Sequence, residues 1–273
     1  MIFQTTEPAL RLRQGTQPLL ISMPHVGTHV PAALAARFTP EAQRVADTDW
    51  HLERLYDFAD AMGASVLVAT HSRYVIDLNR PPDNQNLYPG LDTTSLCPVD
   101  TFDKAALYAA DDAPNETEIA SRREAIWMPY HQALQAELHR LRAQHGAAVL
   151  WDAHSIRSVL PRFFEGKLTD LNLGTANGAS CGPGLAQKML SIASQAQGYT
   201  AVLNGRFKGG HITRTYGQPA LGIHAVQLEM TQCCYMHESL PFDYLPDVAQ
   251  RVQPHLRMML SAALEFAKQQ VKT

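Results

Sequence analysis

Two histidines in this chain follow apolar runs and stand where buried strands are expected to end. His25 follows the run 18–23 after a single proline, Pro24, and His154 lies at the end of the run that starts at Ala147. Ligands of open α/β sheets bind outside the carboxyl ends of the strands, and imidazole is the commonest metal ligand near neutral pH. We therefore predict that His25 and His154 bind a metal. Each could instead hydrogen-bond within a turn, and His29 is a weaker competitor for the same role.

Two aspartates could supply a carboxylate oxygen to the same cation. Asp47 and Asp49 lie in the segment 41–62, whose apolar spacing predicts a helix that ends at Gly63. Acidic side chains are favoured near a helix N-terminus whatever their function. This explains one aspartate, and the other remains a candidate ligand. We prefer Asp49 as the ligand, with Asp47 as the alternative.

A further acidic residue, Glu229, stands near the end of the apolar run 222–230. A carboxylate is costly to desolvate unless it is used. Beside a metal it could be the general base that takes a proton from water, and the alternative is a salt bridge to a nearby arginine. Two histidines, one aspartate and this base match a catalytic metal site with one open position. Zinc is preferred because hydrolysis needs no redox change, although such mixed ligands also suit iron, cobalt or manganese.

Two segments combine cationic side chains with a backbone suited to ligand binding. The segment 73–80 alternates charged and apolar residues and is followed by two prolines, and the glycine-rich segment 204–217 is expected to be a loop. Arginine offers a planar fork that suits carboxylates, so a carboxylate substrate is predicted. The alternatives are an internal ion pair between Arg73 and Asp77, and a solvated loop. The candidate substrate-binding residues are Arg73, Asn79, Arg80, Arg206, His211 and Arg214.

The composition narrows the class of protein. The chain has 273 residues, 45% of them hydrophobic, and we expect a single domain over 1–273. A net charge of -3 without a dense Lys/Arg run argues against nucleic acid as a partner. No apolar run reaches transmembrane length and residues 1–17 lack a signal peptide's apolar segment, so we predict a cytoplasmic protein with no membrane partner. The oligomeric state stays open.

Apolar runs and their breaks predict the elements that position these residues. The residues 83–114, rich in Pro, Asn, Asp and Gly with a turn at 88–90, are long for a loop and are expected to form a functional flap or lid. The helix over 115–145 should bend at Pro129 and end at Gly146. Strands are expected at 18–23, 64–70, 73–80, 147–155, 170–175 and 222–230, and further helices at 185–197 and 246–270.

Six motifs occur in an order that resembles one enzyme family, and they span almost the whole chain. They are PHVG (24–27), DTDW (47–50), the segments 73–81 and 205–217, WDAHS (151–155) and QLEMT (227–231). The sequence resembles the N-formylglutamate deformylase family, also called N-formylglutamate amidohydrolase. The resemblance implies hydrolysis of N-formyl-L-glutamate to formate and L-glutamate, the last step of one histidine degradation route. It also implies a three-layer αβα fold with a mixed, largely parallel sheet, similar to zinc carboxypeptidases and aspartoacylases.

The resemblance assigns roles to particular residues. In the related zinc enzymes a His-x-x-Glu motif provides two metal ligands, a distant histidine provides the third, and an Asn-Arg pair grips the substrate carboxylate. Asn79-Arg80 resembles that pair, and His154 resembles the distant ligand. Thr28, not Glu, stands three residues after His25. The carboxylate ligand must then come from elsewhere, for which Asp49 is the candidate.

The predicted reaction is hydrolysis of an amide or ester, in which Glu229 activates water and an arginine or the metal stabilises the oxyanion. Formylglutamate has two carboxylates, which suits the number of arginines near the candidate site. One competing hypothesis is a zinc carboxypeptidase or another N-acyl amino acid hydrolase. The other is a non-catalytic protein that binds acidic amino acids, in which the histidines are structural.

Overall fold

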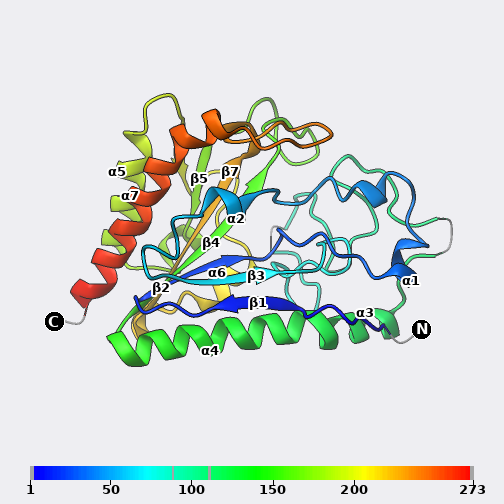
Figure 1. Ribbon diagram of the computed structural model, residues 1–273, viewed down its shortest axis with the longest axis horizontal. Coiled ribbons are helices and arrows are strands. Elements are labelled where there is room, and N and C mark those ends of the chain that lie inside the picture. The colour runs from blue at the N-terminus through cyan, green and yellow to red at the C-terminus, as the bar shows by residue number, and fades with distance from the viewer. Residues whose placement is uncertain (1–2, 88, 110–111, 271–273) are drawn as a thin grey trace.

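The computed structural model describes residues 3–87, 89–109 and 112–270. A seven-stranded sheet in the order β1-β3-β2-β4-β7-β5-β6 forms its middle layer (Figure 1). Strands β3, β2, β4 and β7 are parallel, whereas β1 and β5 each pair antiparallel with a neighbour, and β6 runs parallel to β5. The mixed, largely parallel sheet is thus confirmed. The strands are β1 (Leu10–Arg13), β2 (Leu19–Met23), β3 (Ser65–Ala69), β4 (Ala148–Ile156), β5 (Leu171–Gly174), β6 (Ala201–Leu203) and β7 (Ile223–Thr231).

Burial explains which strands could be predicted. Every residue of β2, β3, β4, β5 and β7 is buried, and a strand covered on both faces reads as a continuous apolar run. These strands confirm five of the expected ones. The edge strands β1 and β6 are only partly buried, so they carry no such run and were not predicted.

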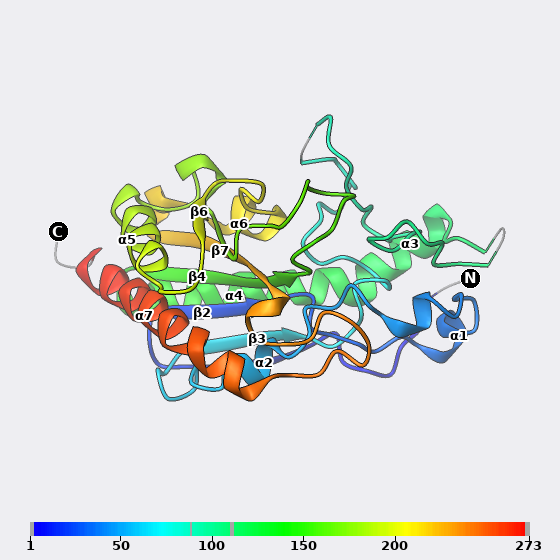
Figure 2. The same ribbon diagram turned by 90° about the horizontal axis from the view of Figure 1, so that it is seen from above.

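Helices cover both faces of the sheet (Figures 1 and 2). Leu20 and Leu150 pack on the layer with α4 and α6, whereas Ile21 and Trp151 pack on the layer with α5 and α7. This alternation is the period of a strand, and it confirms the three-layer αβα fold.

No helix among the described residues has both the length and the apolar character that a membrane crossing requires. The helices are α1 (Ala32–Ala35), α2 (Leu52–Leu55), α3 (Glu116–Arg122), α4 (Met128–His145), α5 (Pro183–Ser194), α6 (His211–Tyr216) and α7 (Pro246–Gln270), with short 3-10 turns η1 (Ala42–Arg44), η3 (Ala176–Gly178), η4 (Pro219–Leu221) and η5 (Gln232–Cys234).

The helix expected over 115–145 consists of α3, a π-helical turn η2 (Arg123–Trp127) and α4. The carboxamide of Asn115 accepts a hydrogen bond from a backbone amide of α3, and Gly146 ends α4 at a φ of 79°. The π turn lies directly before Pro129, whose nitrogen cannot donate to a carbonyl one turn back. The bend expected at Pro129 stays a prediction, and the irregularity observed beside it is this π turn. The helices expected at 185–197 and 246–270 are confirmed as α5 and α7.

The helix expected over 41–62 is wrong, because only η1 and α2 are helical there. Val45 and His51 have φ angles of 42° and 61°, a left-handed conformation that an α-helix cannot continue. The amide of Asp49 donates to the carbonyl of His25 (3.0 Å), and this bond holds the segment at the end of β2. The apolar spacing reflects burial rather than a helix.

The strand expected over 73–80 is also wrong, since this buried segment forms turns. The amide of Arg80 donates to the carbonyl of Asp77 (3.3 Å), and the Asp77 carboxylate accepts the Asn79 amide (2.9 Å). Such local bonds replace the ladder of a strand. The loop expected over 204–217 is wrong in its second half, which α6 occupies.

The irregular character of 83–114 is confirmed for its described residues, which contain isolated bridges but no helix or strand. Tyr88 of the expected turn lies outside the described residues, as do residues 110 and 111. The proposed role of the segment as a flap or lid stays a prediction.

Candidate active site

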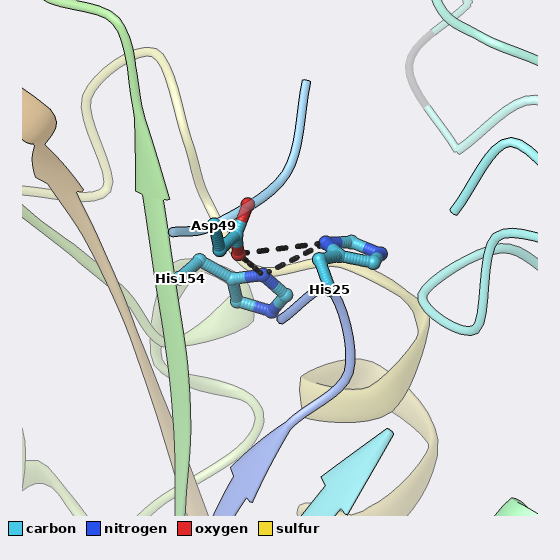
Figure 3. Close-up of side chains that lie close together, drawn as sticks. All are labelled: His25, Asp49 and His154. Carbon is cyan, nitrogen blue, oxygen red and sulfur yellow. Dashed lines mark hydrogen bonds and ion pairs between the residues drawn. The ribbon is translucent and has the colours of Figure 1, made fainter. Parts of the chain in front are cut away.

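Three buried side chains from distant parts of the chain converge at one end of the sheet (Figure 3). His25 follows β2, His154 lies in β4, and Asp49 comes from the turn before α2. The His154 Nδ1 atom lies 3.2 Å from His25 Nδ1 and 3.1 Å from Asp49 Oδ2. The third separation, His25 Nδ1 to Asp49 Oδ2, is 3.7 Å. Each side chain is at most 4% exposed.

These separations fit a divalent cation. Zinc bonds of about 2.0–2.1 Å to nitrogen and oxygen place tetrahedral ligand atoms about 3.3 Å apart, a value that lies within the range of the three observed separations. Three protein ligands leave one position for water or substrate, which is typical of a catalytic site. The carboxylate that approaches both histidines belongs to Asp49. Thr28, which stands where a His-x-x-Glu motif would have its glutamate, is exposed.

The second nitrogen of each histidine also has a carboxylate partner. His25 Nε2 lies 2.7 Å from Asp77 Oδ1, and His154 Nε2 lies 3.2 Å from Asp152 Oδ1. A carboxylate that accepts the Nε2 proton leaves the Nδ1 lone pair for a metal and fixes the orientation of the ring. Asp77 and Asp152 were not predicted in this role. For Asp152 a signal existed, since a residue two positions before His154 points to the same face of the strand.

The charges of this cluster depend on burial and on the mutual contacts of its members. Burial raises the pKa of Asp49, but hydrogen bonds from His154 and His25 outweigh it and hold that pKa below the usual value. Burial lowers the pKa of His154, but Asp152 and Asp49 outweigh it and raise that pKa well above the usual value. Without a cation, His154 therefore holds a proton at neutral pH, and a cation that binds its Nδ1 must displace that proton.

Glu229 lies beside this cluster. It pairs in register with His154 across the parallel strands β7 and β4, so the two residues are about 4.8 Å apart along the sheet and point to the same face. Its side chain lines the same pocket and is 8% exposed. Burial raises the pKa of Glu229 to about 8. A buried carboxyl with a raised pKa, next to a candidate metal site, is suited to accept a proton from water.

Four of the six candidate substrate-binding residues line this pocket, namely Arg73, Asn79, Arg80 and Arg206. Sequence reasoning did not assign a role to other residues of the pocket wall. Phe207 and Gln227 lie in two of the motifs given above, and nothing in the local pattern of the others distinguishes them from core or loop residues. The missed residues include Asp92, Phe102, Ile156, Phe163, Phe207 and Gln227.

The internal ion pair considered for Arg73 is present. Its guanidinium lies 2.6 Å from Asp77 Oδ2 and 3.8 Å from Asp49 Oδ1, and it stacks 4.7 Å from the ring centre of Phe102. Arg80 donates to the Thr94 hydroxyl (3.1 Å). Arg73 thus neutralises the acidic groups behind the candidate metal ligands.

His211 and Arg214 are not among the described residues that line the pocket. The ring of His211 lies against the rings of Trp127 and His131, with centres 5.7 and 5.5 Å apart. Arg214 is exposed, and its Nε donates to the Gly209 carbonyl (2.8 Å). The structure therefore places both beside the pocket wall and not in it.

The alternative ligands lie outside the cluster. Asp47 accepts hydrogen bonds from the Tyr74 hydroxyl and the Phe102 amide, both at 2.7 Å. His29 packs edge-on against His71, with ring centres 4.9 Å apart. The geometry thus favours Asp49 over Asp47, and His25 over His29.

Comparison with known proteins gives one consistent result. The family model described as N-formylglutamate amidohydrolase matches residues 17–236. A protein from Pseudomonas putida named N-formylglutamate deformylase is 52% identical over 260 residues, which are 95% of this chain and 97% of that protein. A protein of the same name from Pseudomonas aeruginosa is 49% identical over 263 residues, covering 96% of this chain and 98% of that protein.

Solved structures show the same fold. The crystal structure of an N-formylglutamate amidohydrolase from Ralstonia eutropha aligns with a TM-score of 0.80 and 24% identity, over 97% of this chain and 99% of that one. A gene product from Agrobacterium tumefaciens aligns with a TM-score of 0.70 and 17% identity, over 98% and 97% of the two chains. Since the family model spans most of the sequence and the two relatives cover nearly all of it, the chain belongs to the N-formylglutamate amidohydrolase family.

Proposed function

We propose that this protein hydrolyses N-formyl-L-glutamate to formate and L-glutamate, with a divalent cation, preferably zinc, as cofactor. The observation that carries the proposal is one pocket lined by His25, His154, a buried glutamate and several arginines, with Asp49 in contact with both histidines. The names of the two Pseudomonas relatives support the same substrate.

Recognition of the substrate would come from the polar wall of the pocket. Asn79 and Arg80 are suited to bind one carboxylate, since a guanidinium and an amide both donate hydrogen bonds to it. Arg206, on a different loop, is the candidate for the other carboxylate. Phe102 and Phe163, whose ring centres are 5.0 Å apart, provide an apolar surface for the methylene groups.

The chemistry would combine a cation with one acid–base group. When bound by His25, Asp49 and His154, the cation supplies a Lewis acid that polarises the formyl carbonyl. Glu229 accepts a proton from the water that attacks the formyl carbon, and it returns that proton to the amide nitrogen as the C–N bond breaks. Formate and the free amine of glutamate are then the products.

The test is a comparison of acyl groups on one amino acid. Purified protein loaded with zinc is given N-formyl-, N-acetyl- and N-benzoyl-L-glutamate, together with a dipeptide that ends in glutamate. We expect release of formate, with kcat/KM highest for the formyl substrate, and loss of activity after chelation that zinc restores. Faster cleavage of the dipeptide or of the larger acyl groups would instead support a carboxypeptidase or a general acyl hydrolase. Binding of glutamate without turnover would support a binding protein.

A further inference from the structure

The turn that carries Asn79 and Arg80 is held from behind by side chains of the long helix. The ring nitrogen Nε2 of His131 donates to the carbonyl of Leu78 (2.9 Å), and the indole nitrogen of Trp127 donates to the carbonyl of Arg80 (3.1 Å). These two acceptors flank Asn79. The backbone of the turn is therefore fixed at two points by groups that do not line the pocket.

The same pattern continues along the neighbouring residues. Arg122 donates to the carbonyl of Val75 (3.0 Å), and Arg123 donates to the carbonyl of Pro82 (3.0 Å). Four carbonyls between residues 75 and 82 thus accept hydrogen bonds from one helical segment. A turn has no ladder of its own to satisfy its carbonyls, so these side chains determine its course.

The donor on His131 is fixed by its surroundings. The carbonyl of Leu78 can only accept, so Nε2 carries the proton and Nδ1 is left to accept from the Tyr216 hydroxyl (2.8 Å). Burial, with His211 close by, lowers the pKa of His131 to about 3. His131 is therefore a neutral donor of one tautomer over the whole range in which a deformylase would work.

The π turn contributes to this arrangement. Trp127 and His131 stand four residues apart and share one face of the helix, and their rings stack with centres 3.7 Å apart and planes at 22°. Trp127 is the last residue of η2. A π turn adds a residue to the helical turn, so it sets the direction of Trp127 relative to α3.

The opposite side of Asn79 is fixed as well. Its Oδ1 accepts the backbone amide of Ile212 (2.8 Å), and its Nδ2 packs 3.0 Å from His154 Nε2, whose proton goes to Asp152. A Cβ at Gly210 would stand 2.5 Å from Asn79 Nδ2, so only glycine permits this approach. The carboxamide therefore has little room to compensate for a shift of its own backbone.

We propose that Trp127 and His131 are positioning residues that hold the turn 78–80, and through it set the direction of Asn79 and Arg80 toward a carboxylate of the substrate. This inference rests on the proposed function, because it assumes that Arg80 binds that carboxylate. It adds two residues that touch neither the substrate nor the candidate metal ligands.

The test removes each donor while it keeps the packing. Trp127→Phe loses the indole N–H, His131→Leu loses the imidazole donor, and His131→Gln restores an N–H near the position of Nε2. A typical hydrogen bond contributes about twofold to tenfold to an equilibrium constant. We expect the KM for N-formyl-L-glutamate and the Kd for L-glutamate to rise by that factor in Trp127→Phe and His131→Leu. We expect kcat and zinc content to stay near the wild-type values, and His131→Gln to recover part of the loss.

A double-mutant cycle separates positioning from general stability. If Trp127 acts through Arg80, Trp127→Phe should raise the Kd for glutamate much less in an Arg80→Ala background than in the wild type. Leu138→Ala, in the buried face of the same helix, is the matched control, since it should lower the melting temperature and leave KM unchanged.

The outcomes separate the two proposals. Wild-type protein that neither binds nor cleaves N-formyl-L-glutamate defeats the proposed function. Active wild-type protein whose Trp127→Phe and His131→Leu variants keep the wild-type KM and Kd defeats only the positioning role. The positioning role also fails if the effects of Trp127→Phe and Arg80→Ala simply add. Should a variant fail to fold, Tyr216→Phe weakens the same chain of hydrogen bonds from a different helix and serves in its place.

Discussion

Two walls of the same pocket are built on different principles. The cation wall, defined as His25, Asp49 and His154, takes both histidines from the ends of β2 and β4, which are adjacent parallel strands. The anion wall, defined as Asn79, Arg80 and Arg206, lies on turns and loops. Strand spacing sets the distance between the histidines, whereas contacts between side chains and backbone carbonyls hold the anion wall. A substitution in the cation wall should therefore abolish cation binding and activity. A substitution that disturbs the anion wall should weaken substrate binding only in part.

Asp77 contacts both walls. The Asp77 carboxylate accepts from His25 Nε2, from the Arg73 guanidinium and from the Asn79 amide, at 2.7, 2.6 and 2.9 Å. Burial raises the pKa of Asp77, but His25 and Arg73 outweigh it and hold the pKa well below its usual value. Asp77 therefore stays a carboxylate at neutral pH, and its replacement should affect both cation binding and substrate binding.

The largest effect is expected for His154→Ala, which removes a member of the cation wall. Zinc content of the purified variant should fall to a trace, and deformylation to background. That loss exceeds the roughly 10–100-fold typical of a lost partner to a metal ligand. His29→Ala is the control, because His29 lies outside the cluster. Full zinc content in His154→Ala, measured by elemental analysis, would mean that this histidine is no ligand.

A large effect on turnover alone is expected for Glu229→Gln. The amide cannot accept a proton, so kcat should fall by about 10²–10⁴-fold, while zinc content and the Kd for L-glutamate stay unchanged. Steady-state kinetics and calorimetry check the two halves of this prediction. Equal losses of zinc and turnover would assign Glu229 to the cation wall instead.

The pH dependence follows from the sign of the Glu229 shift. A general base works only when it is deprotonated, so kcat/KM should fall as the pH drops through the pKa of Glu229. Burial raises that pKa to about 8 in the absence of a cation, and a nearby positive charge lowers it again. The acidic limb of the profile should therefore lie below pH 8 in the zinc-loaded protein. A limb that persists unchanged in the residual activity of Glu229→Gln would show that another group titrates.

A moderate effect on both walls is expected for Asp77→Asn. Asparagine keeps one oxygen for His25 Nε2 but loses the negative charge that orients the ring, so zinc affinity should fall by roughly 10–100-fold. The KM should rise at saturating zinc, because an amide nitrogen replaces the oxygen that accepts from Arg73 beside the turn. Asp47→Asn is the matched control, since Asp47 is also buried but touches neither histidine nor Asn79. A change in zinc affinity without a change in KM would show that the walls are independent.

The contrast between strand ends and turns also explains which site residues could be predicted from the sequence. His25 and His154 each end an apolar run, and the ends of parallel strands meet at one edge of a sheet, so their proximity could be inferred. The backbone path that brings Asp49 to the histidines was not predicted, because a helix was expected over 41–62. The left-handed φ angles at Val45 and His51 leave no periodic signal in the sequence.

The anion wall was less accessible to prediction. The presence of Arg73 and Arg80 suggested an anion pocket, but their ion pairs and hydrogen bonds depend on partners that the turn geometry brings near. Trp127 and His131 stand about fifty residues further along the chain, within the helix expected over 115–145. Contacts between a side chain and a distant carbonyl have no spacing rule, so a single sequence does not reveal them.

The smallest effect is expected where the anion wall meets the segment 83–114. Arg162 donates to Asp92 (3.0 Å) and Asp100 (2.9 Å) and to the Thr101 carbonyl (2.6 Å), so it ties this predicted lid to the loop after β4. Partly exposed ion pairs contribute roughly 0–1 kcal/mol each, so Arg162→Gln should raise KM less than about fivefold. The effect should shrink in high salt, because screening already weakens the pairs in the wild type. Lys104→Gln removes a more exposed pair with Asp92 and should change KM even less. A loss in Arg162→Gln as large as that of Asp77→Asn would place Arg162 in the anion wall itself.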